Sequence, residues 1–468
     1  MKRFKIFALI ATLALSLLAS AACGEGGSSV AASGTASTGD RTIHLLGYSR
    51  AVEGEADNWQ KVIDSFEEEN PGVTVDVRWQ GSSSESVQNL TSAKMAGETV
   101  DLFIVGPGLI NSALAEGGLL MDMTDLAEPY LDRFVESTMS GLYIGEHLWG
   151  IPFGDMSIGM VIYNKTLFDE LGLEPPATFE EMVEIGNKLK ENDPSMIPMM
   201  HMGKMPMFWP MWFMETYAQT SDGKSLENIN EFLEGDRSFV GEEEQKAFDK
   251  IKAFLDEGLL TTESFDTDST GLIAAFSQGK TAMFYSMGFA YTAAVNAVGD
   301  SMEIGVFPFP QVVDGAQPQH GGGTSDAIVI PSFASQENLD ITMKFIEYIT
   351  RSENATQIFA ARDLLAPTVK GVEAADIPIR DVLNNEIIPD AMPFLDWIWP
   401  VEVNDAFMSA IPAVLAGQMD SKQATESIQN SMDTVREEQN YVSNWWDNWT
   451  QEQWNAVTPT TIPPDYSK

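Results

Sequence analysis

Hydrophobic positions near the start of the chain alternate between two spacings. Residues 42–48 form an apolar run of strand length, and apolar residues then recur at helical spacing over 59–66. Residues 73–79 alternate with a period of two, as half-buried strands do. A second predicted helix (86–96) and a third strand (100–105) follow. Strand, helix, strand, helix, strand with short connections predicts an α/β fold with a doubly wound parallel sheet.

The rest of the chain repeats these two patterns. Short apolar runs predict strands at 160–163, 281–285 and 327–330. Helical spacing predicts helices around Leu167 and at 179–189, 243–255, 339–350, 356–361 and 406–449. The chain has 468 residues, whereas single hydrophobic cores stop growing at roughly 250–300 residues. We therefore expect two domains.

The first 22 residues have the layout of a secretory signal peptide. Three basic residues precede an apolar run over 6–18, and the small residues 20–22 stand before Cys23, the only cysteine. Diacylglyceryl transfer to Cys23 would make a lipoprotein, and two acyl chains anchor stably. The alternative is cleavage by the general signal peptidase, because Ser20 stands where a lipobox usually has leucine. Residues 23–40, rich in Gly, Ser and Ala, predict a flexible tether.

Net charge and cysteine content narrow the possible partners. The formal charge of −42 disfavours binding to nucleic acid or to anionic headgroups. With one cysteine the chain can form no internal disulfide, so its stability must come from its cores.

Five segments, in order, resemble extracellular solute-binding proteins that serve carbohydrate ABC importers, the relatives of maltodextrin-binding protein. Each is quoted as it stands here. They are Phe66-Glu-Glu-Glu-Asn-Pro-Gly-Val73; Ala96-Gly-Glu98 with Asp101-Leu102; Leu148-Trp-Gly-Ile-Pro152; Tyr163-Asn-Lys165 with Phe168, Gly172-Leu173, Pro176 and Thr178; and Phe276-Ser-Gln-Gly-Lys-Thr-Ala-Met283.

This resemblance implies a two-lobed, type II periplasmic-binding-protein-like fold, with hinge crossovers and a ligand cleft between the lobes. The first lobe is expected to hold residues 41–152 plus 327–350, and the second 157–320 plus 355–468. Crossovers are expected near 152–155, near 321–326 and at Arg351. The Gly321–Gly323 run suits a backbone that flexes or closely approaches a ligand.

Ligands of open parallel sheets bind beyond the carboxyl ends of the strands, and sugars need flat apolar faces beside polar groups. A polar candidate could instead be solvent-exposed or cap a helix, and a tryptophan could instead pack in the core. Asp155, at an expected crossover, is the first choice. The candidate ligand-binding residues are Glu53, Gln80, Ser82, Asp101, Asp155, Trp209, Trp212, Tyr285, Gly288, Phe289, Gly322, Asp326, Trp397 and Trp399.

The sequence favours binding over catalysis. It has no G-x-S-x-G or H-E-x-x-H motif, and its four histidines show no ligand spacing. Residues 196–214 hold eight methionines and His201; soft thioethers could bind Cu(I), but adaptable apolar packing is the preferred interpretation. We therefore expect no cofactor, metal or catalytic residue.

The resemblance and the leader together predict a substrate-binding lipoprotein of an ABC importer. It would be held at Cys23 on the extracellular face of the cell membrane as a monomer. It would capture a neutral sugar or oligosaccharide by closure of its lobes and deliver it to the permease subunits. A cell-surface glycoside hydrolase with two carboxylates, and a surface adhesin or sensor, are the alternatives.

Overall fold

The computed structural model describes residues 40–48, 54–80, 83–115, 117–144, 146–316, 319–362, 364–374, 376–395, 398–438 and 450–458. These residues belong to one unit, which begins at Asp40. Cys23, the expected leader and the expected tether up to residue 39 lie outside the described residues, as do Glu53, Ser82 and Trp397.

The first half confirms the predicted alternation. β1 (Arg41–Tyr48) pairs in parallel with β2 (Val73–Gln80) on one side and with β3 (Leu102–Val105) on the other. α1 (Glu55–Glu69) and α2 (Ser83–Ala96) connect these strands. The helical spacing read from the sequence is the reason that α1 packs, since its buried face carries the aromatic and branched residues between positions 59 and 66.

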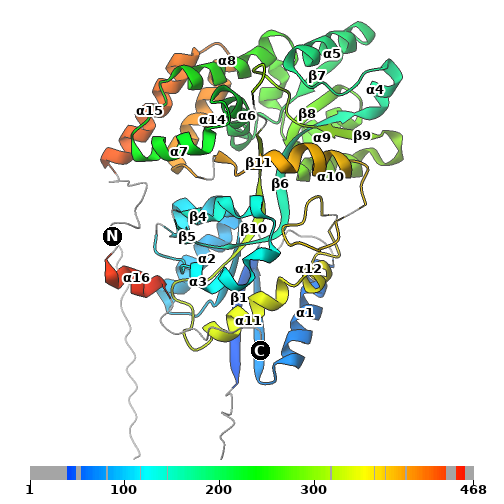
Figure 1. Ribbon diagram of the computed structural model, residues 1–468. Coiled ribbons are helices and arrows are strands. Elements are labelled where there is room, and N and C mark those ends of the chain that lie inside the picture. Colours follow the sequence, from blue (N-terminus) through cyan, green and yellow to red (C-terminus); the bar gives the residue numbers. More distant parts are fainter. Residues whose placement is uncertain are drawn as a thin grey trace, which may run out of the picture. The chain divides into compact units, whose positions relative to one another are not determined.

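Two long antiparallel strands join the two halves (Figure 1). β6 (Ile151–Asn164) and β10 (His320–Val329) pair with each other, and the far end of β10 pairs with β3. The other end of β6 pairs with β8 (Thr281–Met287) and β9 (Ile304–Phe307). Among the described residues the strand order is β2-β1-β3-β10-β6-β8-β7, with β7 (Ile197–Met200) parallel to β8.

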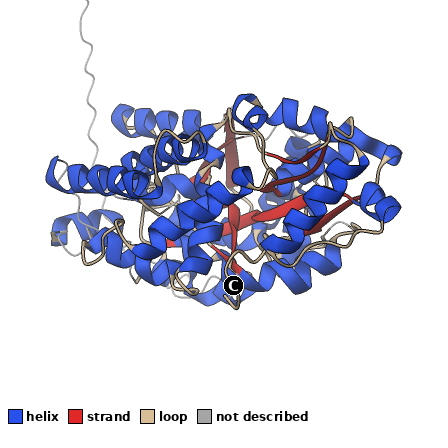
Figure 2. Ribbon diagram, turned by 90° about the horizontal axis from the view of Figure 1, so that it is seen from above, coloured by secondary structure: helices blue, strands red, loops and turns tan. Residues whose placement is uncertain are grey.

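Helices lie on both sides of the strands (Figure 2). The remaining helices are α3 (Thr124–Ala127), α4 (Lys165–Leu171), α5 (Phe179–Asn192), α6 (Pro210–Thr220), α7 (Ser225–Glu234), α8 (Glu242–Asp256), α9 (Ser269–Ser277), α10 (Gly288–Val298), α11 (Leu339–Ile349), α12 (Ser352–Ile358), α13 (Arg380–Val382), α14 (Val401–Leu415), α15 (Ser421–Glu438) and α16 (Gln451–Val457). The remaining strands are β4 (Tyr143–Ile144), β5 (His147–Leu148) and β11 (Ala391–Met392).

Among the described residues, three hydrophobic clusters form the interior. The first half has one, and the two faces of the second-half sheet have one each. β6 shows why: Val161 and Tyr163 enter one cluster, while Met160 and Ile162 enter the other. Side chains of a strand point alternately to opposite faces, so a strand covered by helices on both sides is apolar throughout.

A third crossing segment accompanies β6 and β10, but it is not at Arg351. Arg351 lies between α11 and α12, in the first half, where it pairs with Glu347. The third crossing instead follows α12. Met156 donates its N–H to the carbonyl of Ala366 at 2.8 Å, and Thr368 donates its N–H to the carbonyl of Gly154 at 3.0 Å.

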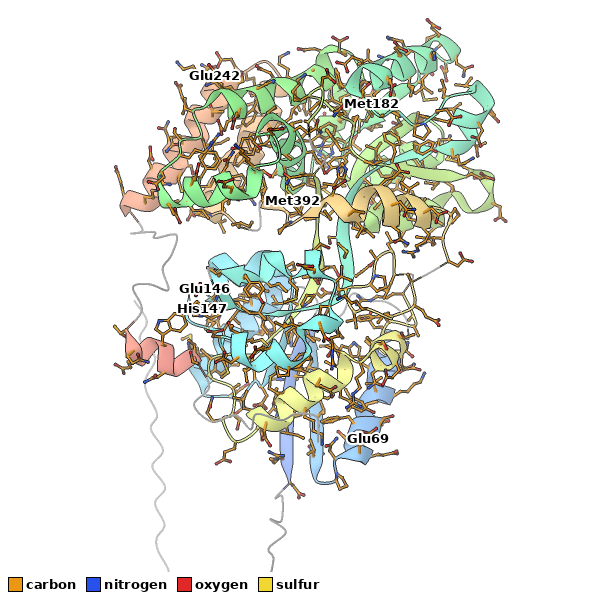
Figure 3. The ribbon with its side chains drawn as sticks, in the orientation of Figure 1. Glu69, Glu146, His147, Met182, Glu242 and Met392 are labelled. Atoms are coloured by element: carbon orange, nitrogen blue, oxygen red, sulfur yellow. The ribbon has the colours of Figure 1, made fainter. Side chains whose placement is uncertain are left out.

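Two segments that the sequence assigned to the second lobe contribute to the first-half core. Ala355 and Ile358 of α12 are buried there, and so is Val457 at the end of α16. The N–H of Asp122 donates to the carbonyl of Val457 at 3.0 Å. The chain therefore ends its described part against the half in which it began (Figures 1 and 3).

α16 is also held by a ring contact, and the histidine that makes it is itself fixed by a carboxylate. His147 (Figure 3) lies with its ring centroid 4.4 Å from that of Trp454. The Nδ1 atom of His147 is 2.6 Å from Oδ2 of Asp122.

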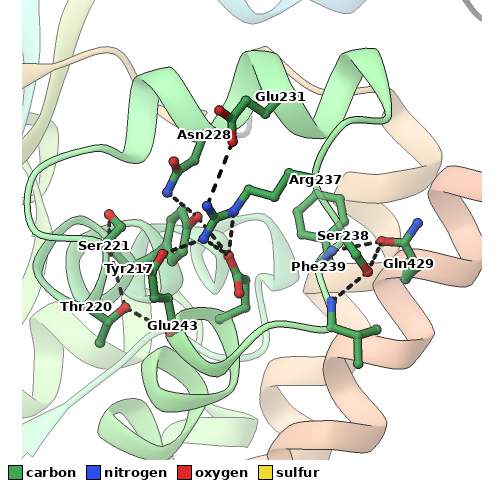
Figure 4. A network of polar contacts seen from close by, with 12 residues as sticks. Tyr217, Thr220, Ser221, Asn228, Glu231, Arg237, Ser238, Phe239, Glu243 and Gln429 are labelled. Atoms are coloured by element: carbon green, nitrogen blue, oxygen red, sulfur yellow. Dashed lines mark hydrogen bonds and ion pairs between the residues drawn. The ribbon is translucent and has the colours of Figure 1, made fainter.

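A buried ion network joins α6, α7 and α8 in the second half (Figure 4). The carboxylate of Glu244 is fully buried; it accepts the hydroxyl of Tyr217 at 2.9 Å and the guanidinium of Arg237 at 2.9 Å. Asn228 donates to the same hydroxyl at 2.8 Å. Burial raises the pKa of Tyr217, and the nearby Glu244 charge raises it further, so this hydroxyl stays protonated.

Close packing within the protein explains the glycines at the start of the Gly321–Gly323 run. A Cβ on Gly321 would lie 2.2 Å from Cε of Met214, and one on Gly322 would lie 2.7 Å from Cβ of Ala391. The missing side chains let β10 pass close to β11 and α6. Gly322, a candidate ligand residue, thus packs against Ala391.

Candidate functional site

A cavity of about 460 Å³ lies where the crossing segments meet, and we call it the hinge cavity. It is lined by Asp155, Met156, Ser157, Met287, Gly288, Phe289, Thr292, Asn296, Ser325, Ala361, Arg362, Leu364 and Leu365. β6, β10 and the third crossing supply one part of this wall, and α10 supplies another. Three candidates from the sequence, Asp155, Gly288 and Phe289, therefore share one cavity.

Asp155 fixes the third crossing segment. Its carboxylate accepts the backbone N–H groups of Leu365 at 3.0 Å and Ala366 at 2.6 Å. Arg380 donates to the carbonyls of Leu364 and Leu365 on the same segment. Burial lowers the pKa of Arg380, and the Asp155 charge offsets part of that lowering. Asp155 lines the cavity while its oxygens are committed to backbone amides.

Arg362 connects the hinge cavity to the strand ends of the first half. Its guanidinium pairs with Glu55, whose Oε2 accepts from Nε at 3.0 Å, and with Asp326 at 3.6 Å. Its Cζ lies 5.2 Å from the ring centroid of Phe359. All three charged side chains are at most 13 % exposed. The candidate Asp326 thus lies beside the hinge cavity as a partner of Arg362.

A small aromatic depression adjoins this ion triad and shares Arg362 with the hinge cavity. The rings of Trp59 and Trp79 are 5.6 Å apart, and Trp59 is 5.7 Å from Phe153. Trp79 lies close to the carboxyl end of β2, where the fold rule places ligands. Gly47 makes room for it, since a Cβ there would lie 2.8 Å from the indole ring.

A bend in β6 brings these groups together. Gly154 has φ 86°, which an L side chain rarely adopts, and the pairing of β6 with β10 shifts register between Thr324 and Asp326. A Cβ at Gly154 would also lie 3.2 Å from Oδ2 of Asp326. The bulge therefore depends on glycine at this position.

The α10 side of the cavity offers an exposed aromatic ring. Phe289 is 47 % exposed, although large apolar side chains are usually buried, and its ring is 5.7 Å from that of Phe208. Thr292 and Asn296 follow on the same helix and supply polar groups. A Cβ at Gly288 would lie 2.6 Å from Cδ1 of Leu365, so glycine allows α10 to approach the third crossing.

The tryptophan-rich stretch is not a cleft wall. Trp209 and Trp212 are 1 % and 0 % exposed, and both belong to the second-half core. Their indole N–H groups donate to the carbonyl of Gly203 and to Nδ1 of His201, each at 3.2 Å. Burial lowers the pKa of His201 to about 3, so the ring is neutral and can accept this bond. The prediction that these two rings face ligand is wrong.

Four further candidates have structural surroundings. Asp101 is fully buried and accepts the N–H groups of His44 at 2.9 Å and Ser335 at 3.0 Å. Trp399 is buried in the second-half core against Phe407. The buried hydroxyl of Tyr285 donates to Glu215 at 2.6 Å, and Gln80 accepts from Asn89. The structure brings none of them into the hinge cavity.

Two residues beside Asp326 were not candidates from the sequence. Arg362 and Glu55 are far apart along the chain, and only the fold brings them to Asp326. A positive φ at Gly154 also has no local signature. The sequence named Phe289 as a candidate because it follows a strand that matched the family pattern.

The methionine-rich stretch packs in the interior. Met199, Met211 and Met214 lie in one second-half cluster, and Met200 and Met202 lie in the other. Among the described residues there is no group of three His, Cys, Asp or Glu side chains placed to hold a metal ion. Within this same part of the chain, none of the helices combines the length and the apolar character that a bilayer crossing needs.

Comparison with known proteins places this geometry in a family. Residues 52–356 match the family model described as bacterial extracellular solute-binding protein. The chain is 22 % identical over 341 residues to the melibiose/raffinose/stachyose-binding protein MelE of Bacillus subtilis. The aligned region covers 70 % of this chain and 75 % of that protein. The chain is 23 % identical over 423 residues to the multiple sugar-binding protein of Streptococcus mutans, spanning 88 % and 93 %.

The fold agrees with this result. A family 1 extracellular solute-binding protein from Bifidobacterium longum subsp. infantis superposes with a TM-score of 0.71 at 19 % identity, covering 85 % of this chain and all of that one. The predicted two-lobed, type II α/β fold is confirmed. The chain belongs to the bacterial extracellular solute-binding protein family.

Proposed function

We propose that the chain captures a neutral sugar or oligosaccharide in the hinge cavity and delivers it to an ABC permease. The observation that carries this proposal is the exposed Phe289 ring in a cavity formed where three crossing segments meet. A pyranose presents a C–H face that packs on an aromatic ring, and its hydroxyls pair with polar side chains such as Thr292 and Asn296. The sugars in the names of MelE and of the multiple sugar-binding protein support the same ligand class.

The charges of the cavity support a neutral ligand. Among the described residues, its charged lining residues are Asp155 and Arg362. Asp155 has Arg380 nearby, while Arg362 stands between two carboxylates, Glu55 and Asp326. A uronate would bring another negative charge toward a guanidinium that is already neutralised, so it gains little from that guanidinium.

The same contacts favour binding over hydrolysis. A glycosidase needs one carboxyl group to protonate the leaving oxygen and another to act as nucleophile or base. Asp155 binds two backbone amides, and Glu55 and Asp326 bind Arg362. These carboxylates hold the hinge together, so we propose no catalytic role for them.

Closure of two lobes about the crossing segments would trap the ligand. β6, β10 and the segment around 364–368 meet at the hinge cavity, so a rotation there would change the distance between Phe289 and the Arg362 triad. We also propose that the chain acts as a monomer, lipid-anchored at Cys23 on the outer face of the cell membrane. Release of a Cys23→Ala variant into the medium would test the anchor.

The sugar proposal is tested with melibiose, raffinose, stachyose and galacturonate by thermal shift and titration calorimetry. At a ligand concentration of about 100 times Kd, binding stabilises the folded state by about 2.7 kcal/mol. We expect a shift with a neutral sugar and none with galacturonate. Phe289→Ala is expected to weaken binding about tenfold or more.

Val295→Ala is the matched control. Val295 is 39 % exposed on the same helix and does not line the hinge cavity. Equal weakening by both substitutions would contradict the stacking role of Phe289. If a broad panel of neutral sugars gave no shift, the ligand class itself would be wrong. Loss of uptake of the bound sugar in cells lacking the chain tests the transport role.

A further inference from the structure

A second cavity lies in the second half and shares no residue with the hinge cavity. Its volume is about 390 Å³, and we call it the proline cavity. Its apolar walls are formed by Pro175, Pro176, Ala177, Phe307, Pro308, Phe309 and Ala316. The remaining lining residues are polar: Gln219, Gln311, His320, Glu386 and Asp390.

The walls of the proline cavity are fixed by hydrogen bonds. Gln219 of α6 donates to the carbonyl of Pro310 at 3.1 Å and accepts the N–H of Val312 at 2.6 Å. Gln311 donates its N–H to the carbonyl of Ala177 at 2.9 Å, and its side chain donates to the carbonyl of Ala316 at 3.1 Å. The cavity is therefore preformed, and each glutamine on its wall already uses one of its two side-chain N–H donors.

His320 leaves an acceptor at this cavity. Oε1 of the fully buried Glu215 accepts the Tyr285 hydroxyl at 2.6 Å and the Gly321 N–H at 3.0 Å. Nδ1 of His320 lies 3.2 Å from Oε2 of Glu215, so we assign the ring proton to Nδ1. In the neutral ring, Nε2 then carries a lone pair. It is buried in a side chain that is 2 % exposed, and it has no hydrogen-bond partner among the described residues.

Two carboxylates complete the polar lining. Glu386 and Asp390 lie on the segment that follows α13, and none of the described Lys or Arg residues lines the cavity. Neither carboxylate forms an ion pair with a described residue. Acceptors dominate what remains for a ligand: Nε2 of His320 and the oxygens of two carboxylates, Glu386 and Asp390, beside one amide N–H on each glutamine. Such a set is complementary to a group that only donates, and a protonated amine is that group.

We propose that the proline cavity is a second binding site, for a small organic cation with a flat apolar body. The ammonium group would lie at Glu386 and Asp390 or reach Nε2 of His320, and the apolar body would pack against the prolines and Phe309. The net charge of −42 raises the local concentration of cations at the surface. The same field and the same acceptors disfavour anions of equal shape.

Three probes with the same indole body separate charge from shape: tryptamine (cation), tryptophol (neutral) and indole-3-acetate (anion). Saturation-transfer NMR and titration calorimetry on the full chain measure their binding. We expect tryptamine to bind saturably, tryptophol about tenfold more weakly, and indole-3-acetate not at all. Equal binding of all three, or binding of none at millimolar concentration, overturns the proposal.

Two variants locate the site. Glu386→Gln with Asp390→Asn is expected to weaken tryptamine binding about tenfold. The control, Glu242→Gln with Asp249→Asn, removes the same charge from exposed positions on α8 and is expected to leave binding unchanged. If both pairs weaken binding equally, the attraction is a general surface effect and the site is refuted.

Ala177→Trp provides a steric test. Ala177 is exposed at the cavity, and its backbone hydrogen bonds do not depend on its side chain. The indole is expected to fill the proline cavity and abolish tryptamine binding while the melting temperature stays unchanged. Retained tryptamine binding in this variant would place the ligand elsewhere and overturn the proposal.

Discussion

Removing the carboxylate of Asp155 is expected to loosen the third crossing segment. In the native protein that carboxylate accepts the N–H groups of Leu365 and Ala366. In Asp155→Ala both amides lose their acceptor, while Arg380 still binds the carbonyls of Leu364 and Leu365. The segment thus keeps one set of contacts and loses the other.

The loss of stability in Asp155→Ala is estimated from these two hydrogen bonds. A hydrogen bond to a charged group contributes about 1.5–3 kcal/mol. Asp155 is half-buried, so water partly replaces the lost acceptor and the lower figure applies to each bond. The pair is therefore worth about 3 kcal/mol. Asp155→Asn keeps one acceptor oxygen and is expected to lose about half of that.

Hydrogen exchange and urea unfolding measure the effect locally and globally. A loss of about 3 kcal/mol corresponds to roughly a hundredfold faster exchange at Leu365 and Ala366. The global free energy of unfolding should fall by no more than the same amount. The Asp155→Asn variant is expected to give roughly tenfold faster exchange at the same two amides.

Asp193 offers a matched control. Its carboxylate also accepts a backbone N–H, that of Ser195 at 2.9 Å, and it accepts the Ser195 hydroxyl at 2.7 Å, but in an exposed turn. Asp193→Ala should change stability far less than Asp155→Ala does. If exchange at Leu365 and Ala366 is the same in the Asp155→Ala variant and the parent, the clamp does not hold the crossing, and this reasoning fails.

Three further predictions concern the interior. Trp209→Ala should lower the free energy of unfolding by about 3–5 kcal/mol, measured with urea. Phe289→Ala should lower it much less because the Phe289 ring is exposed. Equal losses would contradict the assignment of Trp209 to the core. Arg237→Met leaves the buried Glu244 without its cation and should lower the free energy of unfolding by about 3–5 kcal/mol. Adding Glu244→Gln should restore part of this loss, and no restoration would argue against the ion pair. His201 has a folded pKa of about 3, below its unfolded value, so only the unfolded state takes up a proton as the pH falls below about 6.5. Between pH 6 and 4 the parent should therefore lose about 1.4 kcal/mol per pH unit more than His201→Gln does, and identical slopes would show that the ring is not held neutral.

The order of elements could be predicted from the sequence because it depends on local spacing. The helical spacing that predicted α1 also describes its buried face, and the period-two pattern predicted β2. The ends of elements were less accurate. β6 begins at Ile151, whereas only 160–163 was expected, because a strand covered on both faces lacks alternation.

The site was harder to predict because apolar sequence does not distinguish a cleft wall from a core. An uncharged run with Trp209 and Trp212 suits either place, and α6 buries both rings. Phe289 follows a strand end and Asp155 lies at a crossing, the two topological positions from which the sequence named them, and both line the hinge cavity. Arg362 was missed because its partner Glu55 is 307 residues away along the chain.

The packing of α16 on the first half constrains the order in which the protein can fold. Val457 belongs to the same core as Ile43, so that core unites residues from nearly the two ends of the described chain. During synthesis from the N-terminus, the apolar surface of β1 and its neighbouring strands is fully covered only after α12 and α16 have been made. Contacts of such high sequence separation form slowly. A partly made chain therefore leaves its first half incomplete, and folding finishes only after residue 457 has been made.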